Sequence, residues 1–76
     1  MNSTAATKTT YRVTFTDGTT KTFKSSLSIA WALVTDHNTI YAKSATREGV
    51  ESAARRDADH IRICGIVATV VPVEVV

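Results

Sequence analysis

The sequence predicts a small α+β domain in the order ββαβαβ: a β-hairpin, a helix, a short strand, a second helix and a long C-terminal strand. Three observations predict this fold. Apolar residues alternate with polar ones near the N-terminus, two later segments carry helical spacing, and a continuous apolar run lies near the C-terminus. A chain of 76 residues has room for one core, with both helices expected on one face of a small sheet. The alternative order, ββααβ, joins the two helices directly.

Residues 1–9 are small and polar without periodicity, which predicts a flexible tail ahead of a single domain at 10–76. This N-terminal stretch contains no apolar core of a signal peptide, so we expect a cytoplasmic location.

The first strand and its return form a predicted hairpin. Tyr11, Val13 and Phe15 alternate with polar residues, and a turn containing Gly18 follows. A two-residue turn would place Phe23 on the opposite face from these three side chains. A three-residue loop that ends at Gly18 in the left-handed conformation brings all four onto one face, so we predict this bulged turn.

A helix is predicted from Ser25 or Ser26 to about Asp36, because either serine can cap its first turn. Its core-facing stripe has the spacing i, i+3, i+4, i+7 and consists of Leu27, Ala30, Trp31 and Val34. Ile29 and Leu33 lie off this stripe, which predicts a second apolar flank that another layer or another chain covers.

Residues 39–44 read as a short strand, with a helix as the alternative. Thr46 is the predicted N-cap of a second helix from Arg47 to about Asp59, with Glu48 near its positive end. The inner face of this helix carries small residues that allow close approach to a sheet.

The run from Ile61 to Val71 is apolar at both odd and even positions, which predicts a strand that is central in the sheet or accepts a partner. Cys64 lies within it and is expected to be a small buried hydrophobe. On an extended strand His60 and Cys64 would stand about 13 Å apart, too far to share one metal ion.

The sequence shows no catalytic constellation, so an enzyme is not expected, and neither is a cofactor or a metal. The two histidines have no nucleophile motif around them, and three glycines are scattered too widely for a phosphate-binding loop. A formal net charge of +2 gives weak evidence for a polyanionic partner.

A nucleic-acid-binding regulator that uses the second predicted helix is the alternative function. Its candidate phosphate contacts are basic residues of that helix and its flanks: Lys43, Arg47, Arg55, Arg56 and Arg62. Acidic residues interleave with them, which favours a solvated helix face over a nucleic-acid surface.

The favoured function is a non-enzymatic protein-interaction module that binds a protein partner or forms a homodimer; no membrane partner is expected. The candidate interface consists of apolar residues that two helices on one face would leave uncovered: Ile29, Trp31, Leu33, Val67, Val71, Val73 and Val75. Strand addition through Val67 to Val76 is one expected route. In size, single-domain organisation and lack of catalytic parts, the chain resembles small accessory proteins of bacteriophages, including host-directed inhibitors, although it shares no motif with them.

Overall fold

The computed structural model describes residues 8–76, which form five strands and two helices. In chain order these are β1 (Thr9–Thr14), β2 (Thr20–Ser25), β3 (Trp31–Thr35), β4 (Ile40–Ser44), α1 (Arg47–Arg56), α2 (Ala58–Ile63) and β5 (Ala68–Val75). The α+β class is confirmed, but the observed order is ββββααβ, so both predicted element orders are wrong. The predicted tail falls outside the described residues except at its end, where Thr9 already belongs to β1.

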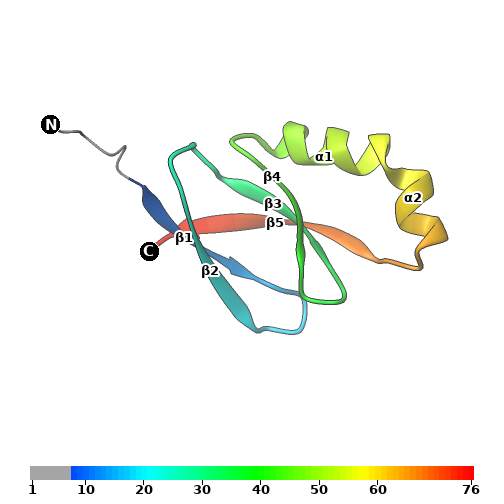
Figure 1. Cartoon of the computed structure of the whole chain (residues 1–76), viewed down its shortest axis with the longest axis horizontal. Helices are drawn as coiled ribbons and strands as arrows, with labels where there is room; N and C mark the ends of the chain where they lie inside the picture. The colour runs from blue at the N-terminus through cyan, green and yellow to red at the C-terminus, as the bar shows by residue number, and fades with distance from the viewer. Residues whose placement is uncertain (1–7) are drawn as a thin grey trace, which may run out of the picture.

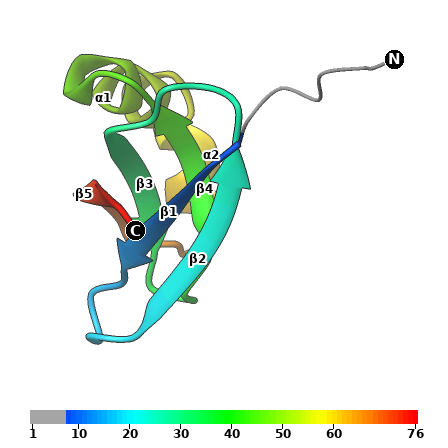
Figure 2. The same ribbon diagram turned by 90° about the vertical axis from the view of Figure 1, so that its left-hand side faces the viewer.

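The five strands form one antiparallel sheet in the order β2-β1-β5-β3-β4. β5 is the central strand, since its last residues pair with β1 and its earlier residues pair with β3. The sheet curls, and α1 and α2 follow one another along the same side of it (Figure 1, Figure 2).

Two hydrophobic clusters lie on opposite faces of the curled sheet. The cluster inside the curl draws on all five strands and consists of Val13, Phe15, Phe23, Ala32, Val34, Ile40, Val71 and Val73. The cluster beneath the helices is centred on Leu33 of β3, Val50 of α1 and Ile61 of α2. Because side chains of a strand alternate between faces, β3 contributes Leu33 to one cluster and Val34 to the other.

The predicted hairpin register is confirmed. Tyr11 pairs with Phe23 across β1 and β2, and their rings stack with centroids 5.4 Å apart. The Phe15 amide donates to the Thr19 carbonyl, and Gly18 takes a φ of 90°. Glycine suits this position because it has no Cβ to clash in the left-handed region.

The predicted helix at residues 25–36 is wrong: Trp31–Thr35 form strand β3. Ala32, Leu33 and Val34 are each fully buried, so this strand is covered on both faces and has no polar side to give it an alternating pattern. The apolar spacing that indicated a helix is therefore produced by a continuous buried run, which periodicity alone does not distinguish from a helix. The second apolar flank is real in composition, but α1 and α2 cover Leu33.

The turn between β3 and β4 has the same construction as the first one. The Thr35 amide donates to the Thr39 carbonyl, as the Phe15 amide does to Thr19. Asn38 holds the left-handed position with a φ of 59°, where asparagine is tolerated better than most residues. The predicted short strand at residues 39–44 is confirmed as β4.

The predicted N-cap is also confirmed, since the Thr46 side chain accepts a hydrogen bond from the Gly49 amide. α1 approaches β4 closely at Gly49, where a Cβ would collide with the Ser44 side chain. The small residues of this helix therefore do allow close packing on the sheet.

The predicted strand from Ile61 to Val71 is wrong in its first half, because α2 continues to Ile63 and β5 begins at Ala68. A Schellman motif ends α2: the Ile66 amide donates to the Ile61 carbonyl, and the Gly65 amide donates to the Arg62 carbonyl. Gly65 has a φ of 68°, and Ile61 and Ile66 pack in the same cluster, an apolar contact that often accompanies this motif. Glycine after a helical segment was the sequence signal for this end.

Candidate functional site

The predicted apolar interface is divided by the fold. Ile29 and Leu33 are buried, and Trp31 is half-buried with the Arg47 guanidinium 5.4 Å from its ring centre. Of the four valines, Val71 and Val73 pack against the cluster inside the curl, whereas Val67 and Val75 are more than 60% exposed. The predicted residues therefore do not form one continuous surface.

The fold restricts strand addition through residues 67–76 without testing it. β5 has β3 on one edge and β1 on the other, with Ala68 to Pro72 paired with β3 and Val73 to Val75 paired with β1. Each of these residues is paired on one edge, so β5 offers no continuous free edge along its length. Strand addition at β5 stays a prediction, and the apolar character of β5 also agrees with its position in the middle of the sheet.

The exposed apolar side chains gather at two ends of the molecule. Leu27 and Val75 flank Tyr11, whose hydroxyl donates to the Leu27 carbonyl and whose strand partner is Val75. Ile63 and Val67 lie near the link between α2 and β5. Sequence reasoning missed Leu27 and Ile63 because it assigned both of them to the wrong element.

The basic residues proposed for nucleic acid are mostly engaged with acidic neighbours. Arg47 contacts Glu51 at 3.2 Å, and Arg62 contacts Asp59 at 3.0 Å. Arg56 contacts Asp57 at 3.3 Å. The hydrogen bonds from Arg56 lower the pKa of the Asp57 carboxyl, and desolvation, the second-largest effect, only partly offsets them. Arg55 donates to the Ser52 hydroxyl instead. All four arginines belong to the helices, and this surface is close to charge balance.

A different group of cations lies at the outer edge of the sheet. β2 is an outermost strand, and within residues 8–76 it pairs with β1 alone. Lys21 and Lys24 project from it, and the curl brings Lys43 of β4 to within 4.9 Å of the Phe23 ring centre. We refer to β2 together with Lys43 as the β2 edge.

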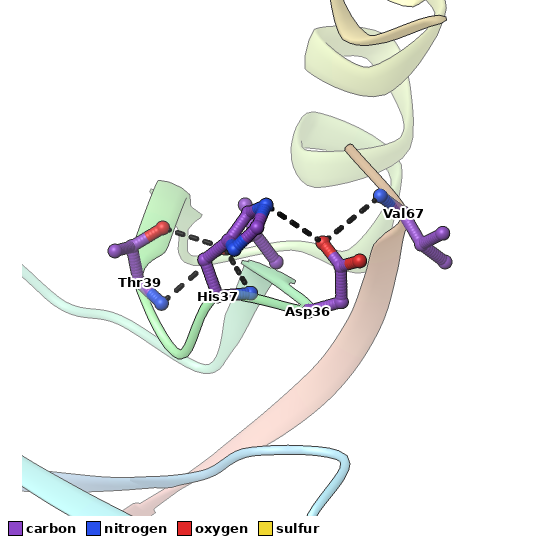
Figure 3. Close-up of polar contacts among 5 residues, drawn as sticks. Asp36, His37, Thr39 and Val67 are labelled. Atoms are coloured by element: carbon purple, nitrogen blue, oxygen red, sulfur yellow. Dashed lines mark hydrogen bonds and ion pairs between the residues drawn. The ribbon is translucent and has the colours of Figure 1, made fainter. Parts of the chain in front are cut away.

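The turn between β3 and β4 holds one of the two histidines. Figure 3 shows the His37 ring directed toward the Asp36 carboxylate, at 3.8 Å, while the same carboxylate accepts from the Val67 amide at 3.2 Å. The buried Thr35 hydroxyl accepts from the His37 and Thr39 amides. These contacts tie the turn to the start of β5, and among the described residues no hydroxyl or thiol side chain is bonded to the His37 ring.

The other histidine pairs with the cysteine. Cys64 is exposed rather than buried, and its sulfur lies 3.7 Å from Nε2 of His60. The expected separation of about 13 Å is wrong because the segment is helical, which places residues four apart on one face. No group of three or more His, Cys, Asp or Glu side chains that fits a metal ion occurs within residues 8–76.

A third polar group joins β4 to the helices. The Tyr41 hydroxyl donates to the Asp57 carboxylate at 3.2 Å. Desolvation, followed by the interaction with Asp57, raises the pKa of Tyr41, so this phenol stays protonated at neutral pH and keeps donating.

The part of the chain that the structure describes encloses no pocket, and it has no helix of the length and hydrophobicity needed to cross a membrane. Comparison of the chain with protein-family models, with curated proteins and with solved structures gives no significant match.

Proposed function

We propose that this chain is a non-catalytic protein-interaction module that binds an extended segment of a partner protein along the β2 edge. The observation that carries the proposal is the open edge itself: β2 pairs with β1 on one side and with no described strand on the other. Outward-facing amide and carbonyl groups of an edge strand can bond to an added strand. This route is distinct from strand addition at β5.

β2 suits this role better than β4, which is the other outermost strand. The register of β2 against β1 runs without interruption from Thr20 to Ser25, so its outer groups are regularly spaced. β4 carries an irregularity in its pairing with β3, and α1 packs against it. Bulges and covering helices are common ways in which proteins protect an edge from pairing.

Apolar surface near one end of β2 supports the same proposal. Leu27 follows β2 by two residues and is 72% exposed, and Val75 is 69% exposed on the far side of Tyr11. A partner that extends beyond Ser25 would cover part of this surface. Burial of such side chains contributes roughly 25 cal/mol for each Å² removed from water.

The test is selection of binders from a library of short random peptides, followed by amide hydrogen exchange measured by NMR. We expect the selected peptides to slow exchange at outward-facing amides of β2 and to leave α1 amides unchanged. A selected peptide with alternate backbone nitrogens methylated keeps its side chains and loses its donors, so its binding should fall sharply. Failure to select any peptide, or protection confined to the helices, would overturn the proposal.

The nucleic-acid alternative has less support, because Arg47, Arg56 and Arg62 each contact a carboxylate. Self-association and a phage-type inhibitory role stay predictions.

A further inference from the structure

The two kinds of basic residue are distributed differently over the surface. Four of the five arginines form ion pairs, and these are Arg12, Arg47, Arg56 and Arg62. None of the four lysines has an acidic partner within residues 8–76, although all four are exposed. Three of these lysines define the β2 edge: Lys21, Lys24 and Lys43.

Two acidic side chains on elements next to β2 have hydrogen-bond or ion-pair partners. Asp17, in the turn before β2, accepts from the Thr19 hydroxyl and the Asn38 amide. Glu74, on the far side of β1, contacts Arg12 at 3.3 Å. None of the three lysines of the β2 edge forms an ion pair with a described residue, and Asp17 keeps its negative charge because its two donors are neutral, so the edge and its turn carry a net positive charge beside an unpaired strand.

We infer that the segment bound at the β2 edge is acidic, with carboxylates opposite Lys21 and Lys24 and an apolar residue opposite Phe23. This inference rests on the proposed function. Directly opposed residues of paired strands lie on the same face about 5 Å apart, so each lysine would meet one carboxylate. An antiparallel partner would then read acidic, apolar, any residue, acidic.

The partner residue opposite Phe23 is expected to be apolar for a separate reason. Phe23 is half-buried, stacks on Tyr11 and has Lys43 above its ring, so its remaining exposed surface is apolar with a cation beside it. An apolar side chain would cover the ring, and Lys43 would remain near the carboxylate opposite Lys21, which shares the face of Phe23. Opposite charges arranged in this way raise both association rate and specificity.

Pairing of the full length of β2 with β2 of a second copy is disfavoured. The antiparallel register that pairs the whole of β2 with itself places Thr20 opposite Ser25 and therefore Lys21 opposite Lys24. Like charges directly opposite each other destabilise a strand pair. In this register the charge of the edge disfavours self-pairing and favours an acidic segment.

The experiment compares two labelled peptides of the same length, one with the acidic, apolar, any, acidic pattern and one with lysine in place of each acidic residue. Binding is measured by fluorescence anisotropy at several salt concentrations. We expect only the acidic peptide to bind, with an affinity that falls as salt rises. Lys21→Glu combined with Lys24→Glu should weaken it by roughly tenfold or more and favour the basic peptide. Arg55→Glu, on α1, is the matched control and should leave binding unchanged.

The outcomes separate this inference from the function on which it rests. If the library yields peptides that protect β2 but carry no excess of acidic residues, the inference is wrong and the interaction module stands. If no peptide protects β2, the proposed function fails as well. If a single-stranded oligonucleotide binds through Lys21 and Lys24 more tightly than the acidic peptide, the edge recognises phosphate and the inference is overturned.

Discussion

The two hairpins of this domain share a turn and differ in their surroundings. In each, an amide before the loop donates to the carbonyl after it, and the last loop residue is left-handed: Gly18 in the first and Asn38 in the second. The strands of the first hairpin keep one exposed face, whereas β3 is buried on both. Turn chemistry therefore specifies each hairpin locally, but burial by the rest of the fold decides whether its strands keep an alternating sequence.

The largest expected effect tests the difference in burial. Leu33 of β3 is fully buried beneath α1, so Leu33→Ala should lower the free energy of unfolding by about 2–5 kcal/mol, through lost burial and a residual cavity. Thr14→Ala, on the exposed face of β1, should change it by less than about 0.5 kcal/mol. Urea denaturation followed by circular dichroism measures both. Equal effects would show that Leu33 is no better buried than Thr14.

The same difference explains what the sequence could predict. Tyr11, Val13 and Phe15 alternate with polar residues, so the face, the register and the left-handed Gly18 all followed from local rules. The cap at Thr46 is equally local, and it was predicted correctly. In β3, the apolar residues of two faces merge into one run, and nothing within that run separates a buried strand from a helix.

The prediction for residues 58–71 was wrong for a related reason. Ile61 and Ile63 lie on α2, and Val70 and Val71 lie on β5, yet the four look like one apolar strand in the sequence. In the sequence only Gly65 marks the boundary between α2 and β5, and in the structure this glycine has a positive φ. The candidate site could not be predicted because it depends on the strand order. β5 lies in the middle of the sheet and β2 is an outermost strand, whose short alternation of threonine and lysine gives no apolar signal.

The next effect tests whether the two turns are equivalent. Gly18→Ala and Asn38→Ala each force a Cβ-bearing residue without a capping side chain into the left-handed region, at a cost of about 1–2 kcal/mol. Asn38→Gly relieves the backbone but loses the bond to Asp17, so it should destabilise the domain less than Asn38→Ala does. Thermal unfolding ranks the three variants. A larger loss in Asn38→Gly than in Asn38→Ala would mean that the positive φ at residue 38 does not carry the expected cost, because both variants lose the same side-chain bond.

The smallest effect concerns the contact between the two turns, and it appears only in acid. The Thr19 hydroxyl, then the Thr19 amide and the Asn38 side chain, donate to the Asp17 carboxylate and lower its pKa from 3.8 to about 2. A carboxyl whose pKa is lower in the folded state stabilises the fold above its unfolded pKa, and this contribution disappears as the pH falls through the folded value. The stability gap between the natural protein and Asp17→Asn should thus be constant near neutral pH and shrink between about pH 4 and pH 2.

The variants Thr19→Val and Asn38→Ala show how much each hairpin contributes to the lowered pKa of Asp17. Thr19→Val removes a donor from within the first hairpin and should raise the pKa of Asp17 most, because the Thr19 hydroxyl is its strongest partner. Asn38→Ala removes the only donor that comes from the second hairpin and should raise that pKa by less. NMR titration of the Asp17 carboxyl carbon in each variant measures both shifts. An unchanged pKa in Asn38→Ala would mean that the two turns do not communicate through this bond, so that the hairpins are joined by β5 and the hydrophobic interior without it.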